Sequence, residues 1–133
     1  MNMNSEDYIP KNYGDVAAVD RLKRLPFESV RKDIPALLEW LQDGHWYVAE
    51  GIAKYLLPHV NEIAQDLLFI FDGEDSMWKY CIINILIARS PNKLSPSLVE
   101  ALKRIADHPS KIDAEDTVDD AAKAVIANKV LCG

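Results

Sequence analysis

Apolar residues recur along the chain at spacings of three and four, a pattern typical of helices that bury one face. Val16, Val19 and Leu22 form such a stripe, and it follows Asp15, a residue type that caps helix N-termini. No stretch alternates between apolar and polar residues as a strand would, so we predict an all-α fold with about eight helices. The predicted helices span residues 15–25, 27–32, 34–41, 46–57, 60–71, 76–88, 95–107 and 114–131.

Helix-breaking residues separate these segments. Pro26, Pro58 and Pro91 stand where three of the stripes end, and acidic turns at 42–45 and 72–75 separate two further pairs of helices. Asp75 or Ser76 is expected to cap the helix that follows the second turn. We expect residues 1–14 to form a loose leader and residues 15–133 to form one domain.

The most informative feature is an internal repeat. Leu37-Leu38 and Leu67-Leu68 are 30 residues apart, and Trp46 and Trp78 are 32 residues apart. Each copy consists of a helix, an acidic turn and a second helix, and a weaker third copy begins at Leu98. A single helix pair cannot bury both of its faces, so we expect the pairs to stack into a short right-handed solenoid.

This arrangement resembles HEAT-like repeats, in which an aliphatic first helix ends in an Asp-containing turn. The string Leu-Leu-Glu-Trp-Leu-Gln-Asp at 37–43, together with Trp46-x-Val48-Ala49 and Leu57-Pro58-His59, is similar to a small bacterial HEAT-like family of unknown function. The resemblance covers roughly residues 9 to 127. It implies an all-α superhelix of HEAT-like or ARM-like repeats and implies no activity. Small HEAT-like proteins also occur among bacterial immunity proteins, an analogy of fold and size alone.

Composition and charge narrow the classes of function. The 133 residues carry 15 Lys and Arg against 21 Asp and Glu, a net charge of −6, with a pI near 5.0. This balance argues against sequence-independent binding of nucleic acid and against electrostatic binding of anionic lipid. The polar, acidic N-terminus does not resemble a signal peptide, and the apolar run 80–88 is too short to cross a membrane. We therefore expect a cytoplasmic protein whose two cysteines, Cys81 and Cys132, are free thiols.

From the sequence we predict no catalytic residue, no metal site and no cofactor. His59 and Glu62 lie one helical turn apart, but no second pair of ligands stands nearby, so we interpret His59 as a surface histidine. A calcium loop starting at Asp72 would need glycine at its sixth position and glutamate at its twelfth, where Met77 and Ile83 stand. The acidic run 113–120 either stabilises a helix N-terminus or forms a docking patch for a basic partner.

We expect a partner to dock on the second helices of the pairs, which line one face of such a solenoid. Tyrosine is enriched in the centres of interfaces, and the exposed faces of the 46–57 and 76–88 helices each carry one. An alternative places Tyr80 and Ile87 in the core, because their helix is apolar on nearly every side. The turns form a second candidate edge. The candidate binding residues are Tyr47, Glu50, Lys54, Tyr80 and Asn84 on the helices, and Asp43, His45, Asp72 and Glu74 on the turns.

These observations predict a non-enzymatic module that binds another, basic protein, with an immunity or adaptor role as the sharper hypothesis. We expect no nucleic acid or membrane partner, and a monomer or weak homodimer. The alternative function is a small-molecule-binding or enzymatic domain, with a pocket between the 46–57 and 76–88 helices.

Overall fold

The computed structural model describes residues 4–131, and no residue in this range lies in a strand. The prediction of an all-helical chain is therefore confirmed for this part of the protein. The α-helices are α1 (Ser5–Tyr8), α2 (Val16–Leu22), α3 (Phe27–Val30), α4 (Ile34–Leu38), α5 (Tyr47–Leu56), α6 (Ala64–Phe71), α7 (Ser76–Cys81), α8 (Pro96–Asp107), α9 (Lys111–Glu115) and α10 (Val118–Val125). Short 3-10 segments, η1 (Arg31–Asp33), η2 (Glu39–Leu41) and η3 (Leu57–His59), and the π-helical segments η4 (Ile82–Ile87) and η5 (Ile126–Leu131) adjoin them.

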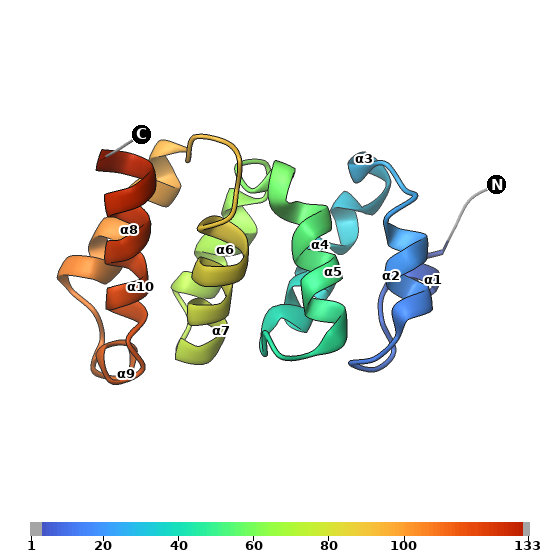
Figure 1. Cartoon of the computed structure of the whole chain (residues 1–133), viewed down its shortest axis with the longest axis horizontal. Coiled ribbons are helices and arrows are strands. Elements are labelled where there is room, and N and C mark those ends of the chain that lie inside the picture. The colour runs from blue at the N-terminus through green and yellow to red at the C-terminus, as the bar shows by residue number, and fades with distance from the viewer. Residues whose placement is uncertain (1–3, 132–133) are drawn as a thin grey trace.

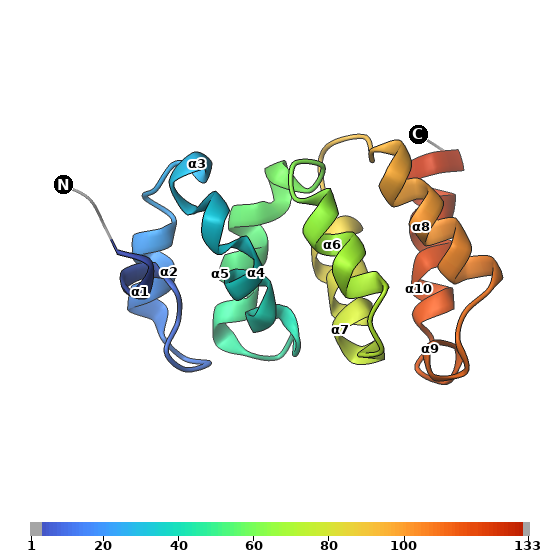
Figure 2. The same cartoon turned by 180° about the vertical axis from the view of Figure 1, so that it is seen from behind.

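The helices form a row of antiparallel pairs that runs from the N-terminus to the C-terminus (Figure 1). The pairs are α1 with α2, α4 with α5, α6 with α7, and α8 with α10. The second helix of each pair lies on the face turned to the viewer in Figure 1, and the first helix lies on the opposite face, seen in Figure 2. Neighbouring second helices contact one another, α2 with α5 and α5 with η4. Two helical layers therefore enclose the space between them.

One apolar core fills the space between the two layers. It is continuous through the row, because each pair contributes fully buried aliphatic side chains. Representative core residues with at most 1% exposure are Leu22, Leu38, Leu41, Ile52, Leu56, Leu67, Ile82, Leu98 and Leu102. Trp40, Trp46 and Trp78 are partly buried and pack against this core. Between residues 4 and 131 no helix is both long and apolar enough to cross a bilayer.

Side-chain caps fix the starts of several helices where the sequence predicts them. The carboxylate of Asp15 accepts a hydrogen bond from the backbone N–H of Ala18, and that of Asp75 accepts one from Trp78, at 3.3 and 3.0 Å. Each cap satisfies a backbone donor that has no partner within the helix. Asp75, rather than Ser76, is therefore the cap of α7.

The N-terminal segment differs from the expected loose leader. Residues 5–8 form α1, and Tyr8 is only 1% exposed within the core. The hydroxyl groups of Tyr8 and Ser5 both donate to the carboxylate of Asp33, at the end of η1. A four-residue helix has no apolar period, so the pattern could not indicate it. The segment is tied down by one aromatic side chain and one distant carboxylate.

The C-terminal segment also differs, because the expected helix at 114–131 is divided. Ser110 caps α9 through the backbone N–H of Asp113, so the helix begins earlier than predicted. Thr117 then adopts a left-handed backbone conformation with φ of 59°, which ends α9 before α10 starts. This conformation is unfavourable for a β-branched residue. The last predicted helix is therefore a short helix, a sharp turn and a second helix.

The buried position of Leu38 makes it a test of the layered core. Leu38→Ala should lower the free energy of unfolding by about 2–5 kcal/mol, because it leaves a cavity between α4 and its neighbours. Phe69→Ala is the matched control, since Phe69 is 79% exposed on α6 and should change stability by less than about 0.5 kcal/mol. Urea denaturation measures both. Equal losses in the two variants would contradict this assignment of core and surface.

Candidate functional site

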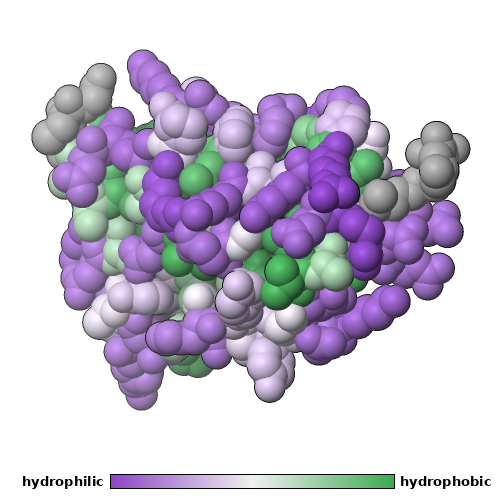
Figure 3. Space-filling model, turned by 45° about the vertical axis from the view of Figure 1, so that its right-hand side comes forward, coloured by the Kyte–Doolittle hydropathy of each residue, from purple (hydrophilic) through white to green (hydrophobic). Residues whose placement is uncertain are grey.

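A groove of about 530 Å³ lies between α2 and α5 and gathers several of the predicted binding residues. We call it the α2–α5 groove. Val16, Val19 and Trp46 supply its apolar lining. Its polar lining residues carry both signs of charge and comprise Asp20, Lys23, His45, Glu50 and Lys54. Figure 3, which brings the N-terminal half of the row forward, shows a largely hydrophilic surface interrupted by small hydrophobic areas.

Tyr47 is the most prominent side chain of the α2–α5 groove. It is 70% exposed, although it begins the ordered helix α5. The next residue, Val48, donates its backbone N–H to the carbonyl oxygen of Tyr13 at 3.1 Å, which joins the segment before α2 to the start of α5. Tyr13 and Val16 are also exposed, at 65% and 42%. The backbone at Tyr47 is thus fixed by the helix and by this hydrogen bond, and its exposed aromatic side chain lies in a region with other exposed apolar side chains.

Gly51 sets how closely the two helices that form the groove approach each other. A Cβ atom at this position would lie 2.5 Å from Cγ1 of Val19. Such a contact is not tolerated, and the β-branched Val19 has little freedom to rotate away. The absence of a side chain at Gly51 therefore lets α2 pack directly on α5.

Glu50 is held in place at the groove by Arg89, which follows η4. The Arg89 guanidinium donates to both carboxylate oxygens of Glu50, at 2.9 and 3.0 Å, and Lys54 lies 3.9 Å from one of them. These hydrogen bonds lower the pKa of Glu50 below its ordinary value of 4.5, and partial burial opposes the change only in part. The ion pair also connects the second helices of two neighbouring pairs.

The other two predicted helix residues lie outside the α2–α5 groove. Tyr80 on α7 is 37% exposed and Asn84 in η4 is half-buried, and neither lines the groove with Tyr47. Ile87 is fully buried, so the core interpretation holds for this residue, whereas Tyr80 reaches the surface. That a partner docks on both Tyr47 and Tyr80 stays a prediction.

The four predicted turn residues separate into two locations. Asp43 accepts hydrogen bonds from the backbone N–H and the imidazole of His45, and the backbone bond is the main reason that the pKa of Asp43 is lowered. His45 lines the α2–α5 groove. Asp72 and Glu74 line a different groove, of about 550 Å³, beside α8 and α9.

Neither of these two grooves lies between α5 and α7, where we expected the pocket of the alternative function.

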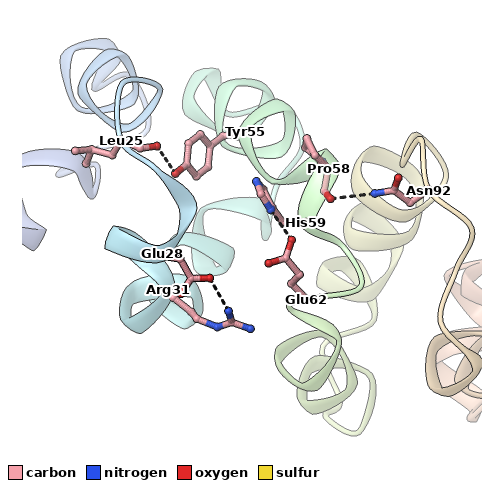
Figure 4. Close-up of polar contacts among 8 residues, drawn as sticks. All are labelled: Leu25, Glu28, Arg31, Tyr55, Pro58, His59, Glu62 and Asn92. Atoms are coloured by element: carbon pink, nitrogen blue, oxygen red, sulfur yellow. Dashed lines mark hydrogen bonds and ion pairs between the residues drawn. The ribbon is translucent and has the colours of Figure 1, made fainter.

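His59 is a packing residue at one edge of the row (Figure 4). Its ring stacks on Phe27 at 4.1 Å between centroids, and its Nδ1 lies 2.8 Å from Oε1 of Glu62. Nearby, the Tyr55 hydroxyl donates to the carbonyl oxygen of Leu25, and Asn92 donates to that of Pro58. Within residues 4–131, no three His, Cys, Asp or Glu side chains are grouped as metal ligands would be. The described contacts of His59 are those of a residue that joins helix ends.

One comparison with known proteins identifies a relationship. The family model described as "Domain of unknown function (DUF5071)" matches residues 8–126, nearly the whole chain. The match begins at the buried Tyr8 and ends just after α10. Among curated proteins, no match was found.

The packing of Gly51 against Val19 generates a test of the groove. Gly51→Ala should destabilise the protein by about 1–3 kcal/mol, because the new methyl group overpacks the contact. In an unobstructed helix the same change stabilises by about 1 kcal/mol. Val19→Ala in the Gly51→Ala background should recover much of the loss, which thermal denaturation of both single variants and the double variant will show. Strictly additive effects would contradict the close approach of α2 and α5.

The Glu50–Arg89 ion pair generates a pH-dependent test. A carboxyl group with a lowered pKa in the folded state stabilises the protein above pH 4.5, and the contribution disappears as the pH falls through the folded-state pKa. Glu50→Gln should therefore cost up to about 1 kcal/mol at neutral pH and progressively less as the pH is lowered below 4.5. A series of urea denaturation curves from neutral to acidic pH measures the difference. A cost that does not depend on pH would mean that the ion pair contributes nothing.

Proposed function

Because the chain belongs to the DUF5071 family, which carries no assigned function, we propose its function from the geometry of the α2–α5 groove. The protein is a non-enzymatic module that binds another protein. The observation that carries this proposal is Tyr47, an aromatic side chain that is 70% exposed at the start of a helix and borders a groove. Such side chains supply a large share of the binding energy in many interfaces.

The row of helix pairs supports a finer interpretation of the fold. We propose that it is a short right-handed superhelix of HEAT-like repeats. The support is that three successive pairs, beginning with α4, correspond to the copies of the sequence repeat. Their second helices share one face (Figure 1). In repeat proteins of this kind, such a face offers an extended surface for a partner.

The α2–α5 groove is suited to a structured partner for two reasons. Tyr47, Val16 and Trp46 provide apolar contact area, and charged groups of both signs surround it, which is the usual composition of an interface. Glu50 is already fixed by Arg89, so a partner that donates to it loses little side-chain entropy on binding.

The charge of the whole chain points to a basic partner. The net charge of −6 attracts a basic protein over long distances and speeds its association. The lining of the groove is nearly balanced in charge. Tyr47 would therefore supply most of the affinity, and the net negative charge of the rest of the chain would select a basic partner. An immunity protein that blocks a basic toxin, or an adaptor that holds a basic partner, would combine these features.

A pull-down from the native host with variants of the tagged protein tests this function. Wild-type protein should retain a basic protein at low salt and less of it at moderate salt. Tyr47→Ala should reduce the retained amount at least about ten-fold, which corresponds to the loss of one hot-spot residue. Its melting temperature should stay nearly unchanged.

Phe69→Ala is the matched control, because Phe69 is a similarly exposed aromatic residue, at 79% against 70% for Tyr47, on α6 in the opposite layer. It should retain the partner fully. Equal retention by the Tyr47 and Phe69 variants, or loss in both, would contradict the assignment of the binding surface to the α2–α5 groove.

A further inference from the structure

A buried ion pair joins α7 to α9. Nζ of Lys79 lies 2.9 Å from Oδ2 of Asp113, and the two side chains are 5% and 6% exposed. Beside this pair, the hydroxyl group of Ser76 donates to the carboxylate of Asp116. Two residues one turn apart on α7 thus hold Asp113 in α9 and Asp116, the residue that follows α9.

Attaching α9 to α7 uses only part of the hydrogen-bonding capacity of Lys79 and Asp113. This attachment uses only one oxygen of Asp113, and Oδ1 is buried with no hydrogen-bond partner among residues 4–131. A buried carboxylate oxygen in this situation is unfavourable, and an ion pair of this kind is often no more stabilising than apolar residues of the same size. Lys79 also has three N–H donors, of which one is directed to Asp113. The pair therefore offers an acceptor and spare donors side by side.

Lys79 and Asp113 line the groove of about 550 Å³ beside α8 and α9, which we call the α8–α9 groove. Its volume is in the range of small-molecule sites, about 300–1,000 Å³. Phe71, Ala101 and Ile105 form an apolar wall that is mostly buried. This groove is separate from the α2–α5 groove and shares no residue with it.

Charged residues of both signs line the α8–α9 groove, and the acidic and basic residues come from different elements. Asp72 and Glu74 come from the turn between α6 and α7, and Arg104 and Lys111 come from α8 and α9. All four are exposed. A ligand with one positive and one negative group would match both sets of charges, whereas a ligand with a single net charge would meet repulsion from one set.

We propose that the α8–α9 groove binds a small zwitterionic molecule that carries an amide group. The amide N–H donates to Oδ1 of Asp113, and the amide oxygen accepts from Nζ of Lys79. The charges of Lys79 and Asp113 neutralise each other, so the ligand group that contacts both of them should be neutral, as an amide is. A charged group at this point would have no counterion. Oδ1 is covered in the structure, so binding includes a small movement of the five-residue helix α9.

Titration of the isotope-labelled full chain with L-glutamine, followed by NMR, tests this site. L-Glutamine has an amide group and a zwitterionic backbone, so saturable shifts should appear at the backbone amides of 72–74, 79 and 110–113. L-Glutamate has the same shape but a carboxylate in place of the amide. It should bind at least about ten-fold more weakly, because it cannot donate to Oδ1.

Two further titrations, one with a blocked glutamine and one with a double variant of the protein, test the proposal. Glutamine blocked at both ends, as in a polypeptide chain, should also bind at least about ten-fold more weakly than free glutamine. Tighter binding of the blocked form would overturn the proposal in favour of a protein side chain. The double variant Lys79→Met with Asp113→Leu should stay folded with an equal or higher melting temperature, and should lose the shifts. Shifts that persist in this variant, or no shifts in the wild-type protein, would overturn the amide site.

Discussion

The burial of one apolar layer between two rows of helices is the constraint on which the structure depends. Each helix pair is too small to bury its inner face alone, so it is stable only against the pairs on either side. The fully buried Leu38 and Ile52 come from one pair and Ile82 comes from the next, and all three belong to one core. Surface features therefore arise where neighbouring pairs meet, and both grooves lie at such junctions. At one of them the missing side chain of Gly51 sets the distance between α2 and α5.

Most of the helices could be predicted from local features of the sequence. Asp15 and Asp75 cap helices as their chemistry predicts, and α5 ends just before Pro58. The differences come from long-range contacts. The helix predicted at 60–71 starts instead at Ala64, and Asn61 just before it uses its side chain to bind the carbonyl oxygen of Lys93 and the N–H of Ser95. Tyr8 is buried because Asp33, distant in sequence, accepts its hydrogen bond.

The candidate sites could be predicted only in part, for a related reason. The apolar periodicity of residues 46–57 correctly placed Tyr47 on the exposed side of its helix. The contribution of α2 to the groove could not be predicted in this way, because periodicity within each helix does not show that α2 and α5 contact each other. From the sequence we expect the acidic run 113–120 either to stabilise a helix N-terminus or to form a docking patch for a basic partner. The structure buries Asp113 against Lys79, while Asp119 and Asp120 lie in the first turn of α10, where the helix dipole favours them. Lys79 within an otherwise apolar helix is the signal that could have indicated the buried pair.

A photo-crosslinking amino acid placed at position 47 tests the central claim most directly, because it reports what lies against this side chain in the cell. We predict that one basic protein is crosslinked at position 47 and that the same protein is absent when the crosslinker is placed at position 69, on the opposite layer. Crosslinking of this protein at 69 but not at 47, or of the same mixture of proteins at both positions, would contradict a specific interface at the α2–α5 groove.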